Sequence, residues 1–326
     1  MLPRERVIHV IEHRKPDRVP LYGWVKENLT PQITEVYGSV ENFEDRFEFD
    51  FAHIFGGPPA WDAEALEDLR THLGRDPEPP EVLDLPVPDP DDPARYQDIR
   101  EQIRHHREER GRFVYVQTPG FFEGYNDHFS IENHLMHLLL FPDALHELYR
   151  RRKDWDIAFA MNCLDLGADM IHLSDDWGAQ HGLMFNPGTW REMIFPYHKA
   201  VAEAVQDRGG YVSLHSDGNI LPVMDGILEI GYHVVHPWQE SAGMSLAHFK
   251  KNYSRHFTVM GGLDIQTTLG FGKRDHLVNE IERVMRLGAD GGVLFCTTHY
   301  VQDHCTMEEL TLAFETAYEM SRKACA

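Results

Sequence analysis

The stretch YVSLHSDGN places a histidine and a carboxylate where an apolar run ends. If that run is a buried strand, His215 and Asp217 point the same way, because side chains two apart in a strand share a face. A third candidate, His299, follows another apolar run near the end of the chain. Two neutral imidazoles and a carboxylate would suit Zn²⁺, or Fe²⁺ in a facial arrangement, with positions left open for substrate. We therefore treat these three residues as candidate metal ligands.

Each candidate also has a purely structural interpretation. His215 would then be a core histidine held by Asp217, and His299 one of the 21 histidines in the chain. Asp175 and Asp176 follow the apolar run MIHLS, so one of them is a candidate general base or substrate acceptor. The alternative is that the Ser-Asp-Asp sequence caps a following helix.

Further polar and aromatic residues stand at the ends of apolar segments and are candidate substrate-binding residues. Core packing is the alternative for the tryptophans and for the cysteine. The candidates are Tyr22, Trp24, Trp177, Trp238, Gln239, Glu240, Asp264 and Cys296.

Short apolar segments that alternate with helical patterns must position these residues. Buried parallel strands have this appearance, and eight of them predict an α/β fold of the (β/α)₈ TIM-barrel type. No GxGxxG sequence follows an early strand, which disfavours a dinucleotide-binding fold. In such a barrel the active site lies at the carboxyl ends of the strands. The predicted strands are residues 19–25, 51–55, 113–120, 170–178, 211–218, 232–239, 257–264 and 291–299.

Composition narrows the function classes. The chain has 326 residues and a formal net charge of −22, which disfavours nucleic acid and anionic membrane surfaces as partners. Its four cysteines form no CxxC pair, and no apolar stretch has the length of a signal peptide core or a membrane span. We therefore expect a cytoplasmic protein.

Several motifs together resemble the uroporphyrinogen decarboxylase superfamily, which includes cobalamin-linked methyltransferases. The resemblance implies one (β/α)₈ barrel domain over residues 1–326, with a deep cleft at the carboxyl ends of the strands. It also makes a homodimer an expectation. The motifs are PDRVPLYGW near the N-terminus, HLSDDWGAQHGLMFNPGTWREMIFPYHKAV, LHSDGNI, MGGLD and GGVLFCTTHYVQDHCTMEEL.

Two branches of this superfamily imply different activities. The decarboxylases carry an arginine-rich N-terminal segment, whereas the matching region here reads YGWVKENLT without arginine. In the methyltransferase branch zinc is held by a His-x-Cys pair and a later Cys. The resemblance places His215 on that histidine, Asp217 on the first cysteine and His299 on the second, with Cys296 three residues early. Both thiolate ligands are thus replaced by harder ones.

The resemblance implies a metal-dependent methyltransferase or O-demethylase, with zinc as the expected ion. It would move a methyl group from a small methoxylated or methylated donor to a corrinoid, on a partner protein, or to another acceptor. One alternative is a decarboxylase or other lyase acting on a small carboxylated substrate. In that case Asp50 would matter more, since the family's catalytic aspartate lies in that region. Another alternative is a non-catalytic barrel that binds a tetrapyrrole or corrinoid.

Overall fold

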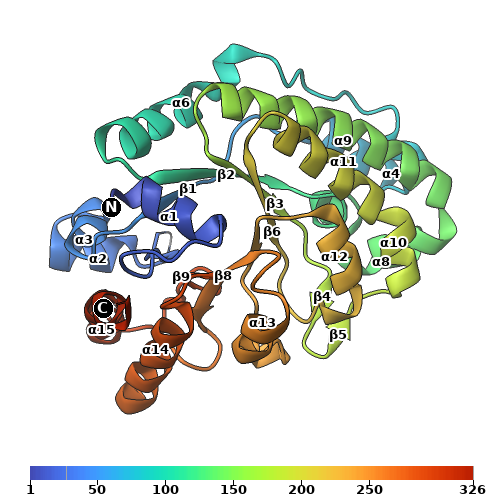
Figure 1. The fold of residues 1–326 in the computed structure, drawn as a ribbon. Helices are drawn as coiled ribbons and strands as arrows, with labels where there is room; N and C mark the ends of the chain where they lie inside the picture. Colours follow the sequence, from blue (N-terminus) through green and yellow to red (C-terminus); the bar gives the residue numbers. More distant parts are fainter. Residues whose placement is uncertain (27, 326) are drawn as a thin grey trace.

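A curled parallel sheet forms the centre of the computed structural model, which describes residues 1–26 and 28–325 (Figure 1). Its strand order is β1-β2-β3-β6-β7-β8-β9, and neighbouring strands in it run parallel. A short antiparallel hairpin, β4–β5, stands apart from this sheet. The strands are β1 Phe51–Ile54, β2 Phe113–Pro119, β3 Met170–Ser174, β4 Gly178–Ala179, β5 Gly182–Leu183, β6 Tyr211–His215, β7 Val234–His236, β8 Thr258–Leu263 and β9 Val293–Thr297.

The first predicted strand, residues 19–25, forms one bridge instead of a full strand. Leu21 bridges Phe295 of β9, and its carbonyl accepts a hydrogen bond from the Asp50 backbone N–H next to β1. Two features interrupt the ladder. Pro20 has no N–H to donate, and the Leu21 N–H is taken by the Asp50 carboxylate at 2.8 Å. Within the described residues the sheet therefore has seven strands, and the prediction of eight is corrected to seven strands with this bridge between the sheet ends.

Helices cover the outside of the sheet. The predicted helix from Trp190 onward is broken at Ile194, because Pro196 cannot donate the hydrogen bond that would continue the turn. Two of the longer helices, α9 and α11, lie side by side over the β3–β6 part of the sheet (Figure 1). The α-helices are α1 Pro3–Ile11, α2 Thr30–Tyr37, α3 Val40–Arg46, α4 Ala63–Leu73, α5 Pro79–Val82, α6 Gln97–Ile103, α7 Asn126–Phe129, α8 Ile131–Leu140, α9 Pro142–Asp165, α10 Pro187–Met193, α11 Phe195–Asp207, α12 Met224–Ile230, α13 Leu246–Asn252, α14 Arg274–Gly288 and α15 Met307–Cys325.

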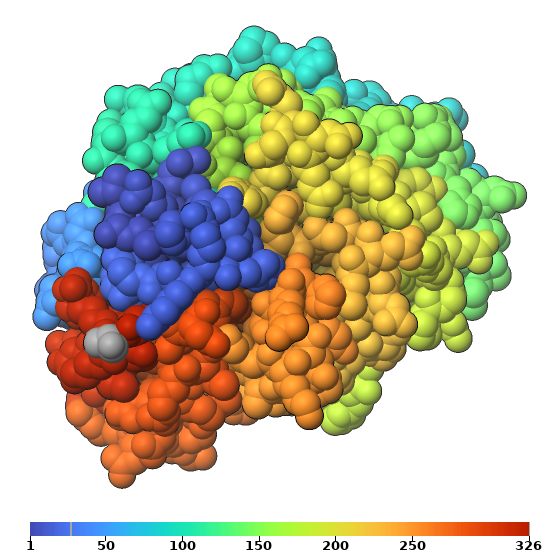
Figure 2. All heavy atoms as spheres, viewed as in Figure 1, coloured from blue at the N-terminus to red at the C-terminus, as the bar shows by residue number. Residues whose placement is uncertain are grey.

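The N-terminal segment covers the amino ends of the strands. The Arg4 backbone N–H donates to Gly111 just before β2, and Thr258 at the start of β8 donates to the Val10 carbonyl. Figure 2 shows these residues in dark blue, between the red C-terminal helix and the yellow and orange segments. This end of the sheet is therefore occupied by the chain itself, which leaves the carboxyl end for a site.

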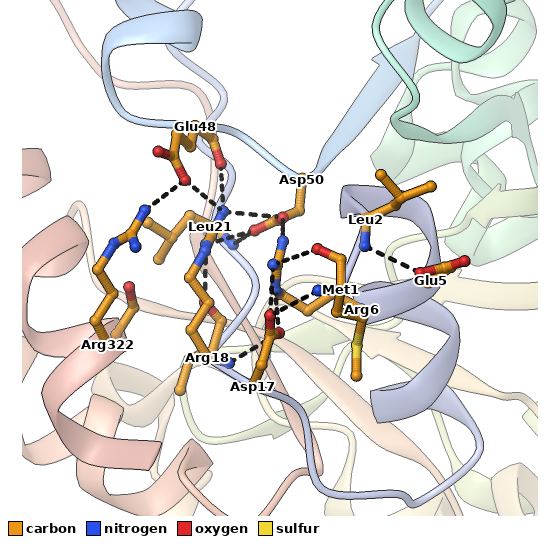
Figure 3. Close-up of polar contacts among 12 residues, drawn as sticks. Met1, Leu2, Glu5, Arg6, Asp17, Arg18, Leu21, Glu48, Asp50 and Arg322 are labelled. Carbon is orange, nitrogen blue, oxygen red and sulfur yellow. Dashed lines mark hydrogen bonds and ion pairs between the residues drawn. The ribbon is translucent and has the colours of Figure 1, made fainter. Parts of the chain in front are cut away.

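An ion-pair cluster anchors this N-terminal cover to the sheet (Figure 3). Fully buried Asp50, just before β1, accepts hydrogen bonds from Arg6 Nη1 at 2.5 Å and from Arg18 Nη1 at 2.8 Å. Together with the Leu21 N–H, these donors occupy both carboxylate oxygens. Asp50 thus lies at the amino end of the sheet as a structural anchor, and the alternative that gave it a catalytic role is not supported.

The cysteines and the longer helices can be compared with the expectations from sequence. All four cysteines are buried and unpaired, as expected from a sequence without a disulfide framework. Among the described helices, none combines the length and the apolar character needed to cross a bilayer.

Candidate metal centre

Three side chains from neighbouring strand ends meet at the carboxyl edge of the sheet. His215 is the last residue of β6, and its strand partner is Ser174, two residues before Asp176. His215 Nε2 lies 3.6 Å from Asp176 Oδ1 and 3.9 Å from Asp217 Oδ1. One ligand atom of each residue lies within 4.8 Å of the other two. The sequence pair His215 and Asp217 thus gains Asp176 as its closest acidic partner.

The turn after β6, and not a shared strand face, places Asp217 here. The strand ends at His215, two residues earlier than the prediction required. The Asp217 N–H donates to Asp176 Oδ1 at 2.7 Å, and Gly218 takes a positive φ of 76°. A Cβ on Gly178 would lie 2.3 Å from the Asp217 carbonyl oxygen, so glycine at that position lets the two loops touch. The loop contact therefore sets the geometry of the carboxylate pair.

A chain of hydrogen bonds fixes which nitrogen of His215 is free. The Thr297 carbonyl can only accept, so His236 Nε2, 3.1 Å away, must carry the proton. Burial holds the pKa of His236 well below its usual range, so the ring is neutral and its Nδ1 accepts from His215 Nδ1 at 2.7 Å. His215 Nδ1 is thereby used, and Nε2 is the nitrogen that faces the two carboxylates. Such outer hydrogen bonds orient histidine ligands in metal sites.

Asp217 has a polar atom that a cation would satisfy. Its Oδ1 is buried and has no hydrogen-bond partner among the described residues. Burial raises the pKa of Asp217 to about 6, His215 opposes that rise, and Asp176 and Asp264 add to it. An ion bound between the three side chains would supply the missing partner and favour the charged carboxylate. These donors therefore fit a divalent ion that accepts oxygen and nitrogen ligands.

His299 lies beside this group but outside the close set. Its ring centre is 6.4 Å from that of His215 and 6.0 Å from that of Trp24. Burial lowers the pKa of His299, and nearby Asp176 opposes that shift. Cys296 is fully buried within β9, and burial raises the pKa of its thiol. Because the thiolate is the metal-binding form, Cys296 acts in packing.

The two neighbouring aspartates have separate tasks. Asp175 is fully buried, and its Oδ2 lies 2.7 Å from His198 Nε2. It also accepts the backbone N–H groups of Phe121 and Glu123. Burial alone would raise the pKa of Asp175, but the hydrogen bond from His198 holds it below its usual range. With its acceptor positions used in anchoring this loop, Asp175 has a structural role, and Asp176 alone of the pair faces the candidate centre.

The four aromatic candidates divide between the centre and the core. Trp24 lies against the His215 ring with centres 5.6 Å apart, and its Nε1 donates to the Tyr115 hydroxyl. Tyr22 packs against Phe49 and Phe51. Trp177 packs against Trp190 and His198, and Trp238 packs under α13 against Phe249. Only Trp24 of these four contacts a candidate ligand in the described part of the chain.

Three polar candidates hold loops near the centre. Gln239 accepts the Gly218 N–H at 2.6 Å, which supports the turn that carries Asp217. Glu240 pairs with Arg283 and accepts the Leu246 N–H. Asp264 accepts hydrogen bonds from the backbone N–H groups of Gln266 and Thr267. These contacts give each residue a structural task.

Sequence reasoning missed Glu123, which begins a short 3₁₀ helix, Glu123–Tyr125, after β2. Its Oε2 accepts a hydrogen bond from Ser174 Oγ at 2.8 Å. Burial raises the pKa of Glu123 to about 8, and nearby Asp176 adds to the rise. The carboxyl is therefore protonated at neutral pH and can donate a proton. In the sequence, the one sign that Glu123 belongs to the site is its position a few residues after the predicted strand 113–120.

Replacing Glu123 should change how stability depends on pH in the metal-free protein. The folded state keeps the Glu123 proton up to a pH of about 8, while the unfolded state loses it near 4.5. Between these values the folded state binds more protons, so stability falls as pH rises. We expect Glu123→Gln to abolish that part of the fall and to be more stable than wild type at pH 9, by about 5 kcal/mol. Urea titrations from pH 5 to pH 9 measure this difference.

The control is Glu132→Gln on the exposed side of α8, which should follow the wild-type curve throughout. A Glu123→Gln curve parallel to wild type would show that Glu123 is ionised in the folded protein at neutral pH.

Comparison with known proteins identifies the family. The family model for uroporphyrinogen decarboxylase (URO-D) matches residues 122–320, more than half of the chain. The chain belongs to this family. The resemblance inferred from the motifs is therefore confirmed.

Solved structures agree at the level of the fold. A methyltransferase from Methanosarcina mazei superposes with a TM-score of 0.74 at 15% identity, covering 98% of this chain and 99% of that one. A B12-independent methionine synthase from Shewanella sp. W3-18-1 has a TM-score of 0.47 at 12% identity, covering 69% of this chain and 67% of that one. The search of curated proteins returned no match. The first similarity supports the fold, and the second is too weak to carry an argument.

Proposed function

We propose that this chain is a metal-dependent methyltransferase that takes a methyl group from a small methoxylated or methylated donor. The observation that carries the proposal is the centre of Asp176, His215 and Asp217, in which the Nε2 atom of His215 faces two carboxylates. Membership of the URO-D family and the fold shared with a methyltransferase support it. The two carboxylates make the donor set harder than a thiolate set.

Asp176, His215 and Asp217 would hold the ion, with His299 beside them. When bound, a divalent ion such as Zn²⁺ supplies Lewis acidity that polarises an oxygen of the substrate. The residues themselves prepare the site before binding. His236 fixes the His215 tautomer, and the loop contact at Gly178 fixes Asp217.

Glu123 would protonate the oxygen that leaves. In transfer from a methyl ether, the C–O bond breaks and its electron pair stays on oxygen. That oxygen takes the proton from Glu123, which is positioned by Ser174 beside Asp176. The methyl group passes to a nucleophilic acceptor, which supplies the electron pair of the new bond. A corrinoid on a partner protein is the acceptor that we propose.

Methylation of cob(I)alamin by tag-free, zinc-supplemented protein in a screen of methoxyarenes tests this function. We expect Asp217→Asn to reduce the rate by at least about 100-fold, because it removes a charged ligand. His181→Ala, an exposed residue in the β4–β5 turn, should retain wild-type activity. Release of carbon dioxide from carboxylated substrates without methyl transfer would instead support a lyase.

A further inference from the structure

A small aromatic cavity adjoins the carboxyl end of the sheet. It has a volume of about 150 Å³ and lies between the loop after β1, the end of β2 and helix α9. Its walls include Phe55, Pro58, Trp61, Trp155 and Phe159. A cavity of this volume is known to bind benzene in another protein. Its size and lining therefore suit a single six-membered ring, and a tetrapyrrole is too large for it.

One charged side chain lines this cavity, and that side chain is buried. Arg152 on α9 is 3% exposed, and its guanidinium carbon lies 5.9 Å from the Trp61 ring centre and 5.5 Å from that of Trp155. Its Nε donates to Asp156 Oδ1, and its Nη2 donates to the Pro119 carbonyl. Arg152 Nη1, which lies beside Gly124, is the guanidinium nitrogen without a hydrogen bond to another described residue. The guanidinium thus keeps N–H donors for a ligand.

The partner carboxylate of Arg152 uses only one of its two oxygens in hydrogen bonds to described residues. Asp156 is fully buried, and its Oδ2 has no hydrogen-bond partner among the described residues. Burial raises the pKa of Asp156 to about 6, against the opposing effect of Arg152. A guanidinium beside apolar walls is a strong site for a carboxylate, because charge-assisted hydrogen bonds strengthen where water is excluded.

The cavity opens on the same edge of the sheet as the candidate metal centre. Pro119, in the cavity wall, pairs with Ser174, which pairs with His215. Two strand spacings separate Pro119 from His215, or roughly 10 Å. Gln117 also lines the cavity, and its Oε1 is buried without a partner among the described residues. A ring held there can present a substituent toward the centre.

We infer that this cavity binds a single-ring aromatic carboxylate, with the ring among Trp61, Trp155 and Phe159 and the carboxylate on Arg152. The inference rests on the proposed function only in naming this ligand as the methyl donor. Binding itself needs neither metal nor methyl transfer, so the two can fail separately.

Calorimetric titration of the metal-free full-length protein with benzoate tests the site, with benzamide and acetate as matched ligands. We expect benzoate to bind at least tenfold more tightly than either, because benzamide lacks the charge and acetate lacks the ring. Asp156→Asn should bind benzoate as tightly as wild type or more tightly. The double variant Arg152→Met with Asp156→Asn should lose about tenfold to 100-fold for benzoate and nothing for benzamide.

The proposal would be overturned if benzoate bound no more tightly than benzamide, or no more tightly than acetate. Loss of both ring ligands in the double variant would also overturn it, because Arg152 would then only maintain the fold. If the double variant does not fold, Ala60→Leu tests whether benzoate binds in this cavity. Ala60 lines the cavity, and the larger leucine side chain would fill part of it. Loss of benzoate binding in Ala60→Leu supports the site, and wild-type affinity contradicts it.

Discussion

Replacing His215 by alanine should abolish stoichiometric binding of a divalent ion. His215 Nε2 is the one nitrogen in the close set with Asp176 and Asp217, and it faces both carboxylates. Its loss leaves two carboxylates without the ligand between them, so we expect the dissociation constant to rise by at least about 100-fold. Metal analysis of tag-free protein after dialysis, followed by zinc titration, measures the change.

Two further variants make this result specific. His181→Ala removes an exposed histidine of the β4–β5 turn and should bind metal like the wild type. His236→Phe keeps the ligand but removes the acceptor that fixes its tautomer, so we expect an intermediate loss of about 10-fold to 100-fold. Unchanged metal content in His215→Ala would place the ion elsewhere, and equal loss in all three variants would indicate general destabilisation.

Replacing Asp50 by asparagine should cost about 3–5 kcal/mol of stability. The substitution keeps the shape of the side chain but leaves the buried guanidinium groups of Arg6 and Arg18 without their shared carboxylate (Figure 3). It also weakens the contact to the Leu21 N–H, where the segment before β1 meets the sheet. Urea denaturation monitored by circular dichroism measures the loss.

Asp17→Asn is the matched control, because Asp17 also pairs with Arg6 but its side chain is 41% exposed. We expect that variant to lose at most about 1 kcal/mol. Metal binding by folded Asp50→Asn should equal that of wild type, since Asp50 lies at the opposite end of the sheet. A stable Asp50→Asn protein without activity would contradict the structural role and restore the lyase alternative.

Much of the fold could be predicted from the sequence. Seven of the eight predicted strand segments contain a strand of the sheet, because short apolar runs between helical patterns are typical of buried parallel strands. The strand prediction for residues 19–25 was wrong for a reason that the pattern of apolar residues cannot reveal. A buried carboxylate twenty-five residues beyond that segment's end competes for the Leu21 N–H.

The candidate centre was predicted only in part. The pair His215 and Asp217 could be found because both follow one apolar run, but their closest partner, Asp176, was indistinguishable from Asp175 in sequence. The separate tasks of Asp175 and Asp176 depend on His198, which contacts Asp175 from helix α11. The position of Glu123 and the hydrogen bond between His236 and His215 depend on contacts between segments far apart in the chain.

The most direct test of the metal centre is anomalous X-ray diffraction from crystals of tag-free protein grown with Zn²⁺, collected at the zinc absorption edge. We expect one strong peak within coordination distance of Asp176 Oδ1, His215 Nε2 and Asp217 Oδ1. The three buried histidines His172, His215 and His236 form the competing set of ligand atoms. A peak among those rings, or no peak near His215, would contradict the proposed centre.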